Sequence, residues 1–223
     1  MEKWGEIMSD ARSRIPARIA KEFKDGDLVN LGIGLPTKVA NYISDDIKVI
    51  LQSENGFVGL GPTPPEGEED MDITNAGEQP VTFKEGAAFF DSATSFAIIR
   101  GGHLDATVLG ALQVDQNGNL ANWMIPGKFV PGMGGAMDLT VGAKRVIVAT
   151  THTTKKGKPK ILKECTLPLT AVNEVDLIVT DLAVIEVTEE GLLLKEKAEG
   201  VSVEEIIEKT EADLKVSPDL KEF

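Results

Sequence analysis

Asp27-Leu-Val-Asn-Leu-Gly-Ile33 and Ile47-Lys-Val-Ile-Leu-Gln52 are two apolar stretches, separated by a segment that starts at Pro36-Thr37 and runs to about Ile43. The two stretches have the length and composition of strands, and the segment between them is typical of a short helix. A strand, a helix and a second strand within about thirty residues form a βαβ unit, which requires a parallel sheet with a right-handed crossover. These residues therefore predict an α/β fold.

The beginning of the chain predicts a helix that would pack on this unit. Met8, Ile15, Ile19 and Phe23 lie at near-helical spacing, and Lys24-Asp-Gly26 closes the pattern. Pro16 interrupts the pattern, so we expect a helix that either kinks at Pro16 or begins there.

Further elements follow the same alternation of strands and helices. We expect strands over 104–112, 145–150, 176–180 and 183–187, and a hairpin of 113–116 with 119–123 around Asn117-Gly118. Helices are expected over 92–99, capped by Asp91 or Ser92, and over 203–209, opened by the capping box Ser202-Val-Glu-Glu205.

Two segments predict irregular structure. Residues 61–86 are rich in proline and acidic side chains and predict a long loop, and residues 126–137 are rich in glycine and proline. No internal repeat or linker divides the chain. We therefore expect a single domain over residues 1–223, with a single open, mostly parallel sheet flanked by helices.

The composition excludes several classes of protein. The 223 residues include 23 basic and 36 acidic side chains, so the net charge is −13, which disfavours nucleic acid as a partner. One cysteine, Cys165, forms no internal disulfide and fits a reducing compartment, so we expect a cytoplasmic protein. The charged first thirty residues do not resemble a signal peptide, and no apolar run is long enough for a membrane helix.

Glu54 is the first candidate for chemistry. It follows the second predicted strand, and ligands bind at the carboxyl ends of strands in open α/β sheets. Asn55-Gly56 predicts a tight turn, and apolar residues on both sides predict partial burial of the carboxylate, which raises its pKa and its nucleophilicity. The alternative is a glutamate that merely ends a strand and points into solvent.

Two glycine-rich turns are further candidates. Gly32-Ile-Gly34-Leu-Pro-Thr37 follows a strand and opens a helix, so its N–H groups could bind an anion. Thr37 stands where a dinucleotide fingerprint has its third glycine, yet Glu54 lies where such a fold has its ribose-binding acid, so a nicotinamide nucleotide stays possible. Gly132-Met-Gly134-Gly135-Ala-Met137 forms either an oxyanion hole or an ordinary corner.

Other chemistries have no support. The chain has no phosphate-binding loop of the ATPase type, and His103, His152 and Cys165 match no zinc spacing, so we expect no metal site and two structural histidines. Lys155-Lys-Gly-Lys158 is expected to be a solvated surface loop.

Several motifs, taken together, resemble family I CoA-transferases of the 3-oxoacid type, and in particular the β-type chains of these two-chain enzymes. The resemblance covers nearly the whole chain. It rests on Asn30-Leu-Gly-Ile-Gly-Leu-Pro36, Leu51-Gln-Ser-Glu54-Asn-Gly-Phe-Val-Gly59, Asn75-Ala-Gly77, Ile99-Arg-Gly-Gly-His103, Ala121-Asn-Trp-Met-Ile-Pro-Gly-Lys128, Gly132-Met-Gly-Gly-Ala-Met-Asp138 and Lys163-Glu-Cys-Thr-Leu-Pro-Leu-Thr170.

The resemblance implies a CoA-transferase that works by a ping-pong mechanism through a glutamyl-CoA thioester. In that family Glu54 would be the nucleophile, and Gly135, with Gly134 beside it, would form the oxyanion hole. Asn30 matches a CoA contact, and we assign CoA binding also to Gly32, Gly34, Asn55 and Gly56. The alternative is a CoA- or nicotinamide-binding module without transferase activity.

The resemblance also implies partners and one departure. CoA would be a substrate, and no cofactor would be needed. An α-type CoA-transferase subunit would complete the enzyme as an α2β2 hetero-oligomer that exchanges acyl-CoA, including acetoacetyl-CoA, with small carboxylic acids in short-chain fatty acid metabolism. Glu78 stands where the animal-type enzymes have a CoA-binding lysine, so Lys128, Lys144 or the lysines at 155–158 are the candidates for that contact.

Overall fold

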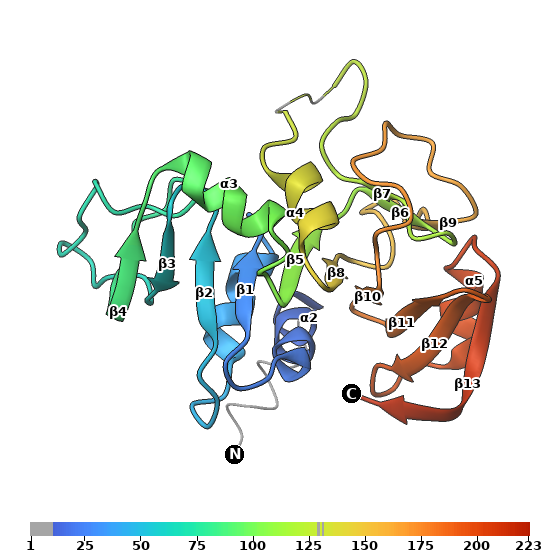
Figure 1. The fold of residues 1–223 in the computed structure, drawn as a ribbon. Coiled ribbons are helices and arrows are strands. Elements are labelled where there is room, and N and C mark those ends of the chain that lie inside the picture. Colours follow the sequence, from blue (N-terminus) through green and yellow to red (C-terminus); the bar gives the residue numbers. More distant parts are fainter. Residues whose placement is uncertain (1–10, 129, 131) are drawn as a thin grey trace.

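The computed structural model describes residues 11–128, 130 and 132–223, and its centre is a group of five parallel strands (Figure 1). These strands are β1 (Leu28–Leu31), β2 (Ile50–Ser53), β5 (Ala106–Gly110), β8 (Val146–Ala149) and β10 (Leu177–Val179). They lie in the order β10-β8-β5-β1-β2, and every neighbouring pair is parallel. The βαβ unit predicted from residues 27–52 is therefore confirmed.

Strands on both sides extend this group into an open sheet of ten strands. They are β3 (Phe57–Leu60) and β4 (Phe83–Phe89) beyond β2, and β11 (Ala183–Thr188), β12 (Gly191–Lys197) and β13 (Leu214–Glu222) beyond β10. The strands β3, β4, β11 and β12 join the sheet in antiparallel pairs, and β13 runs parallel to β12. The prediction of an open, mostly parallel sheet is confirmed.

Helices cover both faces of the parallel strands, because successive side chains of each strand point to opposite faces. On β8, Val146 and Val148 belong to one apolar core, and Ile147 and Ala149 belong to the other. The helices are α2 (Ala11–Ile19), η1 (Ala20–Glu22) and η2 (Pro36–Tyr42) on the second core, and α3 (Ser92–Arg100), α4 (Ala136–Gly142) and α5 (Val203–Glu208) on the first.

A second, three-stranded sheet packs against the first core. It consists of β6 (Gln113–Asp115), β7 (Leu120–Ala121) and β9 (Ile161–Leu162) in the order β7-β6-β9. The hairpin of β6 and β7 turns at Asn117-Gly118, as predicted, and Gly118 adopts the left-handed conformation (φ 75°) that this turn requires.

The predicted caps are also observed. The Asp91 side chain accepts a hydrogen bond from the Thr94 N–H, and the Ser202 side chain accepts one from the Glu205 N–H, so both satisfy free donors at a helix start.

Several elements differ from the predictions. Pro16 lies inside α2, so the helix does not begin there, and Met8 lies outside the described residues. The crossover η2 is a 3-10 helix. The strand β4 begins at Phe83, inside the segment predicted as a loop, because an exposed edge strand has no apolar alternation to reveal it. Sequence reasoning also missed β3, β9, α4, β12 and β13.

His152 is a structural histidine, as expected. It is fully buried, its Nδ1 lies 2.9 Å from Thr180 Oγ1, and its Nε2 lies 2.8 Å from Thr210 Oγ1. Burial lowers the pKa of His152 from 6.5 to about 4, so the folded protein holds the ring neutral.

This burial predicts a loss of stability in mild acid. Between pH 6.5 and 4 the unfolded chain binds a proton at His152 that the folded chain does not bind, so the free energy of unfolding falls by up to about 3 kcal/mol as the pH falls. Urea denaturation of His152→Gln should show a weaker pH dependence in this window than wild type. The exposed His103→Gln is the control and should follow wild type; equal pH dependence of His152→Gln and wild type would refute the assignment.

Candidate active site

Glu54 lies at the carboxyl end of β2, in a turn that only glycine can complete. The Gly56 N–H donates to the Ser53 carbonyl over 3.1 Å, and Gly56 has φ 137°. A Cβ on Gly56 would lie 2.2 Å from the Phe90 carbonyl oxygen, so no side chain fits. The Asn55 side chain donates to the Thr74 carbonyl over 2.7 Å. The predicted tight turn is present, and both neighbours of Glu54 are held in place.

The glycine loop before α4 meets the Glu54 carboxylate. The Gly135 N–H donates to Glu54 Oε1 over 3.3 Å, which joins residues 81 positions apart in the chain. A Cβ on Gly135 would lie 2.6 Å from Glu54 Oε2, and one on Gly134 would lie 3.6 Å from Oε1. The loop therefore approaches Glu54 closely because it lacks side chains, and the structure brings together the predicted nucleophile and the predicted oxyanion-hole glycines.

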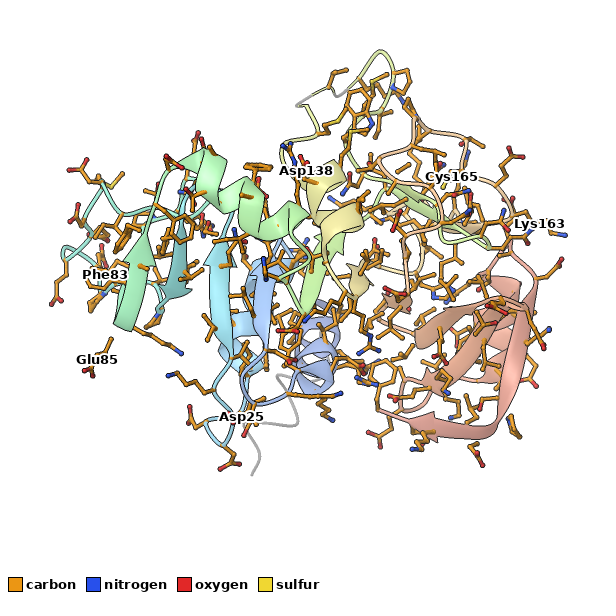
Figure 2. The ribbon with its side chains drawn as sticks, viewed as in Figure 1. Asp25, Phe83, Glu85, Asp138, Lys163 and Cys165 are labelled. Atoms are coloured by element: carbon orange, nitrogen blue, oxygen red, sulfur yellow. The ribbon has the colours of Figure 1, made fainter. Side chains whose placement is uncertain are left out.

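The electrostatic setting of Glu54 matches the prediction from its apolar neighbours. The side chain is half-buried, and this burial raises the pKa of its carboxyl above the usual value. The Gly135 hydrogen bond acts in the opposite direction, and the negative charge of Asp138 raises the pKa further. Asp138 lies on α4, where the Arg100 Nε from α3 donates to its Oδ1 over 2.6 Å (Figure 2).

A buried chain of polar side chains supports the end of β2. The Asn30 amide donates to the side-chain Oε1 of Gln52 over 2.6 Å, and the Gln52 amide donates to Ser95 Oγ over 2.8 Å. The Ser95 hydroxyl donates to the Ser53 carbonyl over 3.4 Å, directly before Glu54. Sequence reasoning missed Gln52 and Ser95 because neither belongs to a local catalytic pattern; Asn30 is only 3% exposed, and its contact with CoA stays a prediction.

The turn after β1 lies at the same edge of the sheet. The Gly32 N–H donates to the Val108 carbonyl over 2.8 Å, so the sheet itself uses this donor. Gly34 has φ 92°, and its carbonyl accepts from the Thr37 hydroxyl over 2.7 Å. The contacts of Gly32, Gly34, Asn55 and Gly56 with CoA stay predictions, but all four residues flank the strand ends near Glu54.

The loop that follows Thr74 is attached to the same turn. The Ala76 N–H donates to Ser53 Oγ over 3.0 Å, and a Cβ on Gly77 would lie 3.4 Å from Ile33 Cγ1. Glu78, which replaces the lysine of the animal-type enzymes, has the left-handed φ of 59° in this loop. The position that departs from the family pattern therefore lies beside the site.

The alternative lysines fall at different places. The Lys144 ammonium donates to Asp105 Oδ1 over 2.8 Å, and Asp105 also accepts from the Leu28 N–H at the amino end of β1. Lys144 therefore lies at the edge of the sheet opposite Glu54. Lys155, Lys156 and Lys158 are exposed in the turn after β8, which begins at the carboxyl end of that strand, as the predicted surface loop requires.

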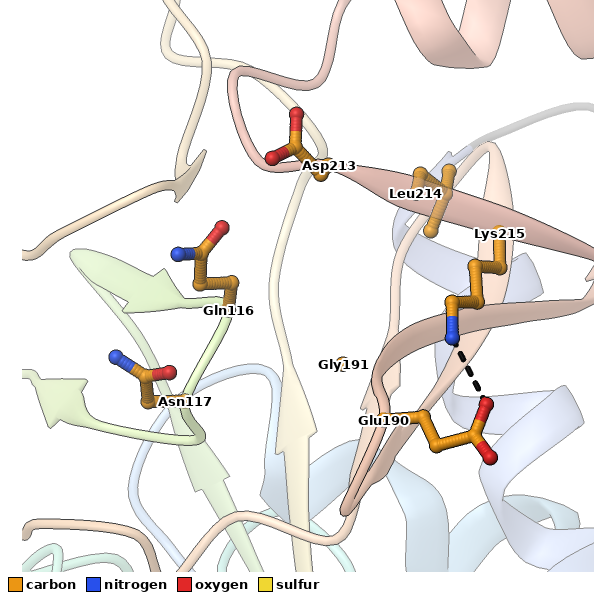
Figure 3. Close-up of a pocket in the computed structure, with 7 residues that line it drawn as sticks. All are labelled: Gln116, Asn117, Glu190, Gly191, Asp213, Leu214 and Lys215. Carbon is orange, nitrogen blue, oxygen red and sulfur yellow. Dashed lines mark hydrogen bonds and ion pairs between the residues drawn. The ribbon is translucent and has the colours of Figure 1, made fainter.

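A hollow of about 380 Å³ lies elsewhere in the fold (Figure 3). It is lined by residues of the β6–β7 turn, the β11–β12 turn and the start of β13, and Lys215 there pairs with Glu190 over 2.8 Å. The strand order separates β13 from β2 by six strands, so this hollow does not belong to the Glu54 site.

The described part of the chain offers neither a metal cluster nor a membrane span. Residues 11–128, 130 and 132–223 contain no cluster of three or more His, Cys, Asp or Glu placed to hold a metal ion. None of the helices in this part of the chain has the length and apolar character needed to cross a bilayer.

Comparison with known proteins agrees with this geometry. Residues 12–209 match the family model described as Coenzyme A transferase. The chain is 58% identical over 214 residues to the beta subunit of the acetate CoA-transferase of Haemophilus influenzae, covering 96% of both chains. It is 55% identical over 213 residues to the mouse mitochondrial succinyl-CoA:3-ketoacid coenzyme A transferase 2B, covering 95% of this chain and 41% of the mouse protein.

A solved structure extends the similarity to the fold. The acyl-CoA transferase YdiF of Escherichia coli O157:H7 aligns with a TM-score of 0.77 and 26% identity, covering 96% of this chain and 43% of that chain. Its thioester complex with CoA aligns with a TM-score of 0.75. The chain belongs to the coenzyme A transferase family, as the sequence motifs indicated.

The contact between Gly135 and Glu54 predicts the effect of one methyl group. In Gly135→Ala the new Cβ would displace the carboxylate, while the backbone (φ −82°) accepts alanine, so the fold should persist and CoA transfer should fall by roughly 10²–10³-fold. Gly110→Ala is the matched control, since a Cβ there meets nothing within 4 Å. Steady-state kinetics with the partner subunit tests this, and an active Gly135→Ala enzyme would contradict the assigned contact.

Proposed function

We propose that this chain is the catalytic subunit of a CoA-transferase that moves CoA between a 3-oxoacyl or short-chain acyl-CoA and a carboxylic acid. The observation that carries the proposal is the half-buried carboxylate of Glu54 at a strand end, with the Gly135 N–H 3.3 Å from its Oε1. Family membership supplies the CoA chemistry, and this geometry supplies a nucleophile and a donor for it.

The proposed reaction begins with attack by Glu54 on the thioester. A carboxylate oxygen forms a bond to the acyl carbon, the carbon–sulfur bond breaks, and CoA leaves as a thiolate from an acyl-glutamyl anhydride. The thiolate then attacks Glu54 Cδ, a carbon–sulfur bond forms, and the first acid leaves as a carboxylate. An incoming carboxylate reverses these steps, so the thioester is conserved and no cofactor is needed beyond CoA as substrate.

The surroundings of Glu54 fit these steps. Each addition passes through a tetrahedral oxyanion, and a fixed backbone N–H such as that of Gly135 stabilises such a charge without reorganisation. Partial burial removes water from the carboxylate, which makes it a stronger nucleophile while raising its pKa. The enzyme should therefore lose activity in acid, where Glu54 binds a proton.

Substrates and partner are proposed from the relatives. Their names include acetate and succinyl-CoA:3-ketoacid CoA-transferases, so small carboxylic acids and their CoA esters, including acetoacetyl-CoA, are the proposed substrates. The bacterial relative is a beta subunit, and the mouse chain is more than twice as long as the matched region. We therefore propose a partner CoA-transferase subunit of the α type in an α2β2 assembly. The lone Cys165 fits work in the cytoplasm.

The covalent step predicts a modified Glu54. The two-subunit enzyme incubated with acetoacetyl-CoA should gain one CoA, and peptide mass spectrometry should place it on the peptide that contains Glu54. Glu54→Gln should bind substrate, form no adduct and lose at least about 10³-fold in turnover. The exposed Glu204→Gln on α5 is the control and should behave as wild type. Full activity of Glu54→Gln would refute the role.

The partner predicts a second result. The chain alone should show almost no CoA transfer, and activity should rise in proportion to the added α-type subunit until the two are equimolar. Size-exclusion chromatography with light scattering measures the assembly, and full activity of the isolated chain would contradict the need for a partner.

A further inference from the structure

We propose that Arg100 and Asp138 form an ion pair that tunes the charge of the Glu54 carboxylate, with Arg100 acting as a positioning residue through Asp138. The inference rests on the proposed function only for its meaning in catalysis. The pair itself is a feature of the fold, and its effect on Glu54 can be measured without turnover.

The pair lies directly behind the glycine loop. Asp138 is in the first turn of α4, three residues after Gly135, and Arg100 is the last residue of α3. The Arg100 Nε lies 2.6 Å from Asp138 Oδ1, and the Asp138 side chain is only 26% exposed. The Arg100 guanidinium also lies 5.7 Å from the centre of the Phe96 ring, which favours a fixed position over the ring.

Close packing fixes the two helices that carry the pair. A Cβ on Gly142 of α4 would lie 2.2 Å from the Ile99 carbonyl oxygen of α3, so the helices touch with no room for a side chain. At its other end, α3 holds the strand that carries the nucleophile, because Ser95 contacts both Gln52 and the Ser53 carbonyl. Helix α3 therefore links the end of β2 to α4, and with it Glu54 to its donor.

The electrostatic consequence follows from this arrangement. Asp138 disfavours the ionised form of Glu54, and the positive charge of Arg100 offsets Asp138. The other charged groups on the surrounding elements are Asp91, which caps α3 beside Gly56, and Glu78 in the loop attached to Ser53. Both stay unchanged when Arg100 or Asp138 is replaced, so the pair can be tested by itself.

Four variants give opposite expectations. Arg100→Gln leaves Asp138 unbalanced and should move the titration midpoint of Glu54 upward by roughly 0.5 pH unit, whereas Asp138→Asn should move it downward. Arg100→Lys keeps the charge and should restore the wild-type midpoint. In the double variant, Arg100→Gln should add little to Asp138→Asn, because Arg100 acts through Asp138.

The direct readout is the carboxyl ¹³C resonance of Glu54 in the full chain, identified by its absence in Glu54→Gln and followed by NMR from pH 3 to 8. Lys215→Gln is the matched control: it removes the same charge from an ion pair at the far edge of the sheet (Figure 3) and should leave the midpoint unchanged. Unshifted midpoints in both single variants, or shifts in the same direction, would overturn the inference. An equal Arg100→Gln shift with and without Asp138 would overturn the action through Asp138.

A kinetic readout separates tuning from simple damage. In the two-subunit enzyme, Arg100→Gln should slow adduct formation from acyl-CoA at pH 5, with little change at pH 8, where Glu54 is ionised in both proteins. An equal loss at every pH would mean that the pair only supports the fold, and this outcome contradicts the proposal. Absence of an adduct in wild type would refute the proposed function instead, while the NMR titration still decides the role of the pair.

Discussion

The hydrogen bond from the Gly135 N–H to Glu54 Oε1 is the contact around which the site is built. A half-buried carboxylate has lost part of its hydration, and a buried polar group without partners is costly. The glycine loop supplies a backbone donor and, having no side chain at Gly134 or Gly135, leaves the space in front of the carboxylate open. The same features that make Glu54 tolerable in the fold leave it reactive.

The sheet brings this contact about. Parallel strands end at one edge, so the residues after β1 and β2 lie together although the chain separates them. Apolar cores on both faces fix the strands, and α3 connects the end of β2 to α4 through Ser95 at one end and the Ile99–Gly142 contact at the other. The position of Glu54 relative to Gly135 thus depends on the packing of one helix.

Much of this could be predicted from local patterns. The central strands are short apolar runs because both of their faces are buried, and Glu54 was found because it follows such a run before Asn55-Gly56. The strand β4 escaped detection because most of its residues are exposed, and α4 because it is only seven residues long and begins in a glycine-rich segment.

The remaining features of the site depend on contacts that no local pattern records. Arg100 and Asp138 lie 38 positions apart, and Gln52 and Ser95 lie 43 apart. The Gly32 N–H, which the sequence offered as an anion donor, bonds instead to Val108 on a neighbouring strand. Such pairings follow from the order of the strands, which a single sequence does not specify.

The most direct test of the account is a crystal structure of the two-subunit enzyme after incubation with acetoacetyl-CoA. The account predicts continuous electron density from Glu54 Cδ to the CoA sulfur, with the thioester oxygen directed at the Gly135 N–H. Well-defined CoA whose sulfur lies far from an unmodified Glu54 would contradict it.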